Sequence, residues 1–211
     1  MKDDAPRRMP ETSGAVDGGL FVSRGLMAGT RIGTAMGWRA VEALAPGDMV
    51  LTFDRGLQPL LEVRRETLWM SDAAMGDTAL VLVPAGAMGN TVDVTLLPDQ
   101  GVLIESEAAC DANGDPFAVL KAKALDGFRG ITRTAPFPQM EVITLVFATD
   151  EVVYAEGGIL LHCPRPVVHP AELGQVHGGY DVVSDRNAAF LVECMAIEAR
   201  GGGVAPVTMA A

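Results

Sequence analysis

The sequence predicts an all-β protein with one helix near its C-terminal end. Its apolar runs are mostly four to six residues long, rich in β-branched residues, and bounded by Gly, Pro, Asp or Asn. Short strands separated by such turn residues favour a sandwich or barrel-like fold. The 211 residues, of which 49% are hydrophobic, are enough to bury a sizeable core in one domain.

The strand pattern begins at Leu20 and continues to Cys163, so residues 20–163 are predicted to form the β domain. Residues 1–18 are polar and contain prolines, and we expect a flexible N-terminal arm. The turn signal Pro46-Gly47-Asp48 precedes a predicted buried strand at 49–53. By the same criteria, further strands are predicted at 80–83, 92–97, 102–105, 142–147 and 151–155.

Two connections inside the β domain have their own signals. Residues 116–126 could hold one helical turn, because their apolar residues do not alternate. Thr149-Asp150-Glu151 lies between two strong strand patterns and predicts a hairpin turn there.

The pattern changes after Cys163, where residues 164–203 are predicted to form a linker and a C-terminal helix. Ser184 or Asp185 can cap a helix at 186–200, and the glycines at 201–203 would end it. Apolar residues cover most of this helix, which predicts that it is largely buried or packed on a partner. Oligomerisation through the helix is therefore an open alternative. Residues 204–211 are expected to form a loose tail.

The composition excludes several classes of function. The net charge of −11 argues against binding to nucleic acid or to an anionic membrane surface. No apolar run is long enough to cross a membrane, and the N-terminus does not resemble a signal peptide. We therefore expect a cytoplasmic location, although non-classical secretion stays open. The three cysteines form no CxxC pair, so neither a zinc site nor a cofactor is expected.

Residues 25–58 carry the most specific motif of the chain. Its fixed positions are Gly29-Thr30, Gly37-Trp38, Val41-Glu42, Leu44, Pro46-Gly47-Asp48 and Val50-Leu51-Thr52. This spacing resembles the opening of bacterial Hint domains, the self-processing fold shared by inteins and the C-terminal part of Hedgehog proteins. The resemblance extends to residue 163 and implies a horseshoe-like all-β fold with pseudo-twofold character.

The resemblance also implies which positions would carry chemistry, and here they hold unsuitable residues. Hint domains have a cysteine or serine nucleophile where this chain has Gly25, and a hydroxyl residue where it has Leu97. Gln100 replaces a histidine that donates to the scissile amide, and glutamine cannot deliver a proton. His162-Cys163 resembles the C-terminal intein motif, but the asparagine that should follow the histidine is missing.

Three functions remain open from the sequence. The first is a Hint domain that is inactive in autoprocessing and acts as a structural or binding module, with an unidentified protein partner. The second is an active self-splicing or autoproteolytic domain that uses unorthodox residues around His162-Cys163. The third is a ligand-binding or hydrolytic protein whose cleft would be lined by Gly25, Leu97, Gln100 and His162.

Other chemically suggestive residues are interpreted structurally. Ser23 could replace the nucleophile, but two residues displace an extended chain by roughly 6.6 Å, too far for attack. His162 and Cys163 are adjacent on a predicted strand, so their side chains should face opposite sides. We expect loop histidines rather than a metal site at His162, His169 and His177. Residues 111–115 should form an Asx-rich turn rather than a calcium loop. Trp38 and Trp69 are expected at core or rim positions, and the side chains of Lys121 and Lys123 are expected to be solvated.

Overall fold

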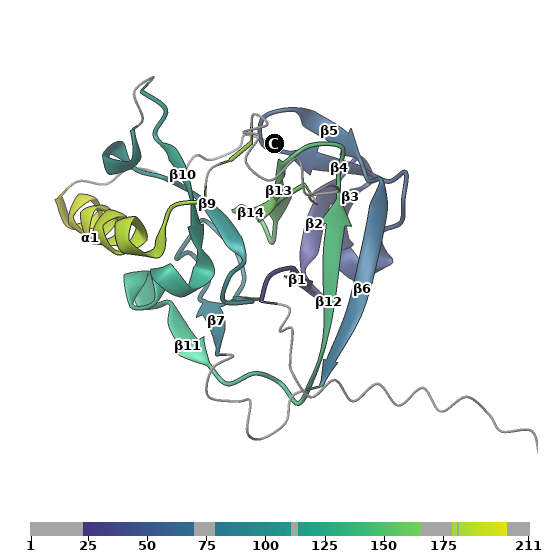
Figure 1. Cartoon of the computed structure of the whole chain (residues 1–211), viewed down its shortest axis with the longest axis horizontal. Helices are drawn as coiled ribbons and strands as arrows, with labels where there is room; N and C mark the ends of the chain where they lie inside the picture. Colours follow the sequence, from purple (N-terminus) through teal and green to yellow (C-terminus); the bar gives the residue numbers. More distant parts are fainter. Residues whose placement is uncertain (1–22, 70–78, 111–113, 166–178, 181, 202–211) are drawn as a thin grey trace, which may run out of the picture.

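The computed structural model describes residues 23–69, 79–110, 114–165, 179–180 and 182–201 (Figure 1). The predicted N-terminal arm at 1–18, the tail at 204–211, His169 and His177 lie outside these residues. The strands are β1 (Leu26–Met27), β2 (Arg31–Thr34), β3 (Gly37–Ala40), β4 (Met49–Thr52), β5 (Gly56–Pro59), β6 (Glu62–Trp69), β7 (Leu80–Val83), β8 (Val94–Leu96), β9 (Gly101–Glu105), β10 (Phe117–Lys121), β11 (Thr132–Thr134), β12 (Gln139–Val146), β13 (Glu151–Ala155) and β14 (Ile159–Cys163). The α-helix is α1 (Asp185–Gly201), and the short 3-10 helices used below are η3 (Glu107–Ala109) and η4 (Ala122–Leu125).

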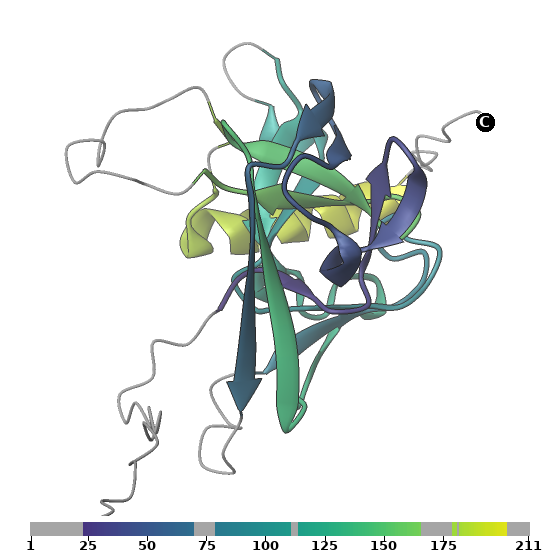
Figure 2. The same cartoon turned by 90° about the vertical axis from the view of Figure 1, so that its right-hand side faces the viewer.

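The strands form three sheets, which confirms the all-β prediction. The largest has the order β10-β9-β14-β13-β2-β4-β5, with β3 paired to β2. The second is β1-β12-β6, and the third is β11-β7-β8. Helix α1 lies beside β9 and β10, whereas the β6–β12 ribbon lies on the opposite side of the molecule (Figure 1). Figure 2 shows this ribbon extending away from the larger sheet.

Helix α1 covers one end of the main core with a single face. Ala188, Leu191 and Met195 are buried among the strand residues of that core. Phe190 and Ile197 point outward and are 65% and 66% exposed. The helix is therefore amphipathic in this chain, and the prediction that it is largely buried holds for one face only.

Residues 116–126 contain a strand and a 3-10 turn, where the sequence suggested a helical turn. Strand β10 pairs antiparallel with β9 along all five residues, from Phe117 opposite Glu105 to Lys121 opposite Gly101. The helical character is confined to η4. The pattern was ambiguous because both faces of β10 contact apolar residues, so apolar and polar residues do not alternate. Ala118 and Leu120 belong to the main core, and Phe117 and Val119 to a cluster on the other face.

The predicted hairpin at Thr149-Asp150-Glu151 is wrong. Strand β12 pairs with β1 and β6, whereas β13 pairs with β14, β2 and β4. The chain therefore passes from one sheet to another at this point. Strong strand patterns on both sides of a turn do not reveal whether those two strands pair with each other.

Strand β6 has no regular apolar pattern, and no strand was predicted at these residues. It pairs with β12 along eight residues, from Glu62 opposite Val146 to Trp69 opposite Gln139. Most of its side chains are exposed, and Trp69 is 74% exposed rather than part of the core. Trp38 lies at the rim, where it is 47% exposed, beside the buried Gly33.

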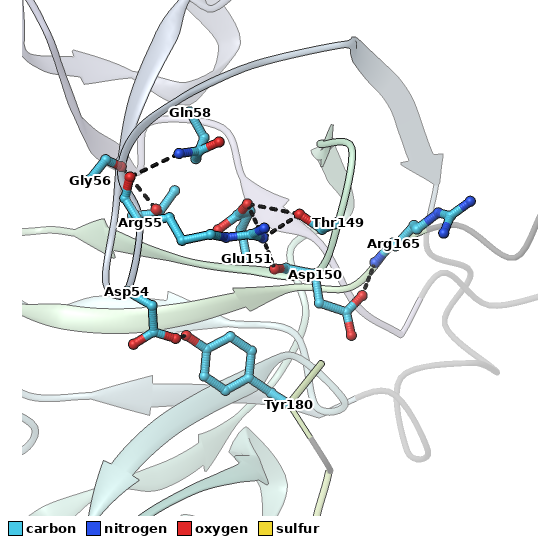
Figure 3. Close-up of polar contacts among 10 residues, drawn as sticks. Asp54, Arg55, Gly56, Gln58, Thr149, Asp150, Glu151, Arg165 and Tyr180 are labelled. Carbon is cyan, nitrogen blue, oxygen red and sulfur yellow. Dashed lines mark hydrogen bonds and ion pairs between the residues drawn. The ribbon is translucent and has the colours of Figure 1, made fainter. Parts of the chain in front are cut away.

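A polar cluster joins the turn between β4 and β5 to the connection between β12 and β13 (Figure 3). The Arg55 guanidinium pairs with the carboxylate of Glu151, which is only 3% exposed. The same guanidinium donates to the hydroxyl of Thr149 and, at 2.9 Å, to the carbonyl of Asp150. Arg55 thus neutralises a buried carboxylate at the point where the chain changes sheets.

Replacing Arg55 with methionine is expected to lower the free energy of unfolding by about 2 kcal/mol. The substitution leaves the Glu151 carboxylate buried without its cation, and the partial exposure of Arg55 moderates the loss. Urea denaturation measures the change. Arg64→Met is the matched control, because it removes an exposed pair with Glu62 and should change stability by less than about 1 kcal/mol. Equal losses of stability in the two variants would contradict the conclusion that Arg55 neutralises a buried carboxylate.

Candidate functional site

Gly25 directly precedes β1 and has neither a side chain nor space for one. Its φ is +130°, a conformation that L side chains rarely adopt. A Cβ atom at this position would lie 2.5 Å from Cγ1 of Val142, on the neighbouring strand β12. The space that a nucleophilic side chain at residue 25 would need is therefore filled by Val142.

Gln100 holds three parts of the chain together through one buried amide. Its Oε1 accepts a hydrogen bond of 3.0 Å from the Gly25 N–H. Its Nε2 donates to the carbonyl of His162 at 2.8 Å and to that of Gly101 at 3.0 Å. The side chain is 2% exposed. The structure therefore brings Gly25, Gln100 and the His162 backbone together through hydrogen bonds of the Gln100 amide.

Leu97 contributes packing at this site. It is fully buried in a small apolar cluster with Leu80, Met140 and Val142. Val142 therefore belongs to the same cluster as Leu97 and lies next to Gly25, two of the positions that the sequence singled out. A hydroxyl group at residue 97 would meet only aliphatic and thioether groups among these neighbours.

His162 and Cys163 lie next to each other in β14 but face opposite sides of the sheet, as predicted. The imidazole lies on the outer face, with its ring centroid 5.8 Å from that of Tyr180. The Cys163 thiol is buried in the main core, and burial raises its pKa to about 12. The histidine is thus not placed to activate the thiol, and the thiol stays protonated at neutral pH.

Lys121 and Lys123 are ion-paired, so the prediction that they are merely solvated is wrong. Lys123 Nζ lies 3.0 Å from Asp99 and 3.5 Å from Asp185, and Lys121 Nζ lies 3.0 Å from Asp185. These four residues, which we call the charge chain, connect the first turn of α1 to the residue before Gln100. No sequence pattern indicated the charge chain, because its members come from three separate segments.

Asp99 extends the charge chain to the residues before Gly25. Its backbone N–H donates to the Ser23 carbonyl at 2.8 Å. Burial opposes ionisation of Asp99, but hydrogen bonds from Lys123 and Ser23 outweigh it and hold the pKa of the carboxyl below its usual range. A carboxylate with a lowered pKa is a weak base, so this contact does not activate the Ser23 hydroxyl.

The residues proposed to line a cleft are buried, and none of them borders the surface depression at Met27, Thr30 and Thr95. Gly25, Leu97, Gln100 and His162 all belong to the buried part of the domain. The depression has a volume of about 210 Å³ and is bordered by residues that include Met27, Thr30, Thr95, Phe137 and Glu156. In the described part of the chain, no three His, Cys, Asp or Glu residues are grouped to hold a metal ion. Within that same part, the helices are too short or too polar to cross a membrane.

The family model for the Hint domain matches residues 24–160, which is more than half of the chain. The chain therefore belongs to the Hint domain family, and its fold is the all-β Hint fold with an additional C-terminal helix. The match begins one residue before Gly25 and ends within β14. A comparison with curated protein sequences gave no match.

Among solved structures, the chain is similar to inteins and intein-like domains. The first is a splice-inactive variant of the AceL NrdHF class 3 split intein, with a TM-score of 0.46 and 14% identity over 68% of this chain and 99% of that one. The second is a bacterial intein-like domain from Clostridium thermocellum, with a TM-score of 0.44 and 17% identity over 66% and 98%. The third is the gp41-1 intein, with a TM-score of 0.39 and 14% identity over 65% and 97%.

Proposed function

We propose that this Hint domain does not cleave itself at Gly25 and serves as a structural or binding module. The observation that carries the proposal is the geometry at Gly25. No nucleophile is present there, and Cγ1 of Val142 occupies the position into which one would project. An acyl shift requires a nucleophilic atom within about 3–3.5 Å of the carbonyl carbon, and residue 25 supplies none.

Gln100 supports the same proposal. An autocleavage site needs a group that protonates or polarises the scissile peptide as the reaction proceeds. The Gln100 amide has no labile proton at neutral pH, and its donor and acceptor atoms are already bound to backbone groups. The contact with the Gly25 N–H therefore holds the chain in place and contributes no acid–base step.

Intact-mass spectrometry of the purified full-length chain tests the proposal. After several days at neutral pH, with dithiothreitol or hydroxylamine added to trap a thioester or ester, the protein is expected to keep its full mass. Release of a fragment that ends at Arg24 would overturn the proposal. Cleavage that disappears in a Cys163→Ala variant would instead support the alternative in which His162-Cys163 is active.

The variant Gly25→Cys/Gln100→His examines the steric part of the proposal. It restores the two residue types that the family uses, but Val142 still occupies the space next to residue 25. We expect this double variant to remain uncleaved in the same assay. Rapid thiol-dependent cleavage would show that Val142 does not block the position.

A further inference from the structure

The surface depression of about 210 Å³ lies where separate segments of the chain meet. It is bordered by the β1–β2 turn, by β8 and the residue before it, by the residue after β13, and by Phe137 from the segment before β12. None of the described residues that line it carries a positive charge. Pockets for drug-sized ligands measure roughly 300–1,000 Å³, so this one suits a smaller molecule.

Thr30 is buried at this depression, and its hydroxyl group forms no hydrogen bond within the described part of the chain. The residue is 7% exposed. Its backbone is engaged on both sides, because the N–H donates to the Met27 carbonyl at 3.1 Å and the carbonyl accepts from Val41 at 2.8 Å. Buried hydroxyl groups normally have a hydrogen-bond partner. The Thr30 hydroxyl is therefore an unused polar group at the depression.

Two carboxylates from different segments line the same depression. Asp93, before β8, accepts a hydrogen bond of 2.9 Å from the Ala85 N–H through Oδ1. Glu156, after β13, accepts from the Arg31 N–H through Oε1. Each carboxylate has a second oxygen outside these bonds, and neither carboxylate forms an ion pair with a residue that the structure describes. The charged groups of the depression are thus all hydrogen-bond acceptors.

The backbone holds Glu156 in position at the depression. Its N–H donates to the Arg31 carbonyl at 3.0 Å, and its carbonyl accepts from the Thr91 N–H at 3.2 Å. Binding of a ligand would therefore order few additional backbone groups at this residue, which lowers the entropic cost of binding.

The rest of the lining is largely apolar. Met27 and Val94 lie among the polar groups, and the Phe137 ring borders the depression while 53% exposed. An exposed aromatic ring of this kind can cover the apolar part of a ligand or lie over a cation. The depression therefore combines acceptor groups with an apolar surface.

We propose that the depression binds a small alkylammonium ion, with its charged group at Thr30, Asp93 and Glu156 and its alkyl chain against Phe137. A primary ammonium group has three donors and no acceptor, which matches the unused acceptors of these three side chains. A carboxylate or phosphate ligand would instead face two like charges. This inference gives the binding role proposed above a ligand class, and it rests on that role.

A divalent metal ion fits the site less well. Calcium takes six to eight oxygen ligands, and the depression has only two carboxylates. The apolar side chains would have no function in such a site. Calcium is nevertheless a useful competing probe.

NMR titration of the ¹⁵N-labelled full chain with n-pentylamine hydrochloride, at pH 7 and low ionic strength, tests the proposal. The amides of Gly29, Thr30 and Val94 are expected to shift and saturate with a Kd of about 1 mM, a typical scale for so small a ligand. 1-Pentanol, which lacks the charge, and ammonium chloride, which lacks the chain, should bind at least about tenfold more weakly.

Three outcomes of the titration would overturn the proposal. The first is the absence of a saturable shift at about 20 mM amine, which is well above the expected Kd. The second is equal binding of pentanol and pentylamine. The third is saturable binding of calcium chloride at the same amides with displacement of the amine.

Variants with isosteric amides assign the binding to the carboxylates. Glu156→Gln and Asp93→Asn keep the acceptor oxygens for the Arg31 and Ala85 N–H groups and remove only the charge. We expect Kd to rise about tenfold in Glu156→Gln and about threefold in Asp93→Asn, whose side chain is more exposed. Glu66→Gln, at an exposed position on β6, is the matched control and should leave Kd unchanged.

An unchanged Kd in both Glu156→Gln and Asp93→Asn would refute the site. Asp93→Asn keeps the test decisive if Glu156→Gln alters the turn after β13. Failure of amine binding is also distinguishable from failure of the proposed function, because the intact-mass measurement contains no amine. A chain that stays intact and does not bind the amine refutes only the ligand, whereas release of a fragment ending at Arg24 refutes the proposed function itself.

Discussion

Replacing Gln100 with leucine is expected to lower the free energy of unfolding by about 3 kcal/mol. Leucine fills a similar volume but removes the partner of the Gly25 N–H and of the His162 carbonyl. Each buried polar group left without a hydrogen bond costs about 1–3 kcal/mol. Urea denaturation followed by circular dichroism measures the loss.

Gln58→Leu is the matched control for this experiment. Gln58 also donates a side-chain hydrogen bond, to the carbonyl of Arg55 at 2.8 Å, but it does so at the surface. Water can replace that bond, so the control should lose less than about 1 kcal/mol. If Gln100→Leu were as stable as the control, the buried Gln100 amide would not hold the three parts of the chain together.

Replacing Gly25 with alanine is expected to destabilise the domain by about 3 kcal/mol. Two costs combine in this variant. The φ of +130° strains any residue with a Cβ, and the new Cβ would lie 2.5 Å from Cγ1 of Val142. The melting temperature and the midpoint of urea denaturation report the sum of the two costs.

The two costs can be separated with a control and a double-mutant cycle. Gly86 has a φ of +85° and would place its Cβ in open space, so Gly86→Ala should lose only the backbone part, about 1 kcal/mol. Val142→Ala combined with Gly25→Ala should relieve the clash and show a coupling energy of about 1 kcal/mol or more. Additive effects in the cycle would mean that Val142 does not restrict residue 25.

The sequence predicted the buried strands better than the exposed ones. Strands β7 and β13 have the predicted bounds, because each is a short apolar run whose position is determined locally. Strand β6 has only one or two apolar residues on each face and owes its conformation to pairing with β12. The hairpin that was wrongly predicted before β13 has the same cause. Strand pairing depends on residues that are distant in the sequence, and no local pattern describes them.

The sequence singled out residues of the candidate site, but the contacts between them could not be predicted. The family resemblance pointed to Gly25, Gln100 and His162, and the structure links them through the Gln100 amide. Val142 carries no chemical signal in the sequence, because a valine in a strand is ordinary. Its proximity to Gly25 results from the pairing of β1 with β12, where Met27 lies opposite Val142.

The charge chain has a consequence for where this domain ends. The family match stops at residue 160, before α1 begins. Yet Asp185 in α1 is linked through Lys123 and Asp99 to Ser23, and Leu191 and Met195 belong to the main core. The smallest unit that keeps these contacts therefore runs from Ser23 through the helix, and the family boundary would divide it.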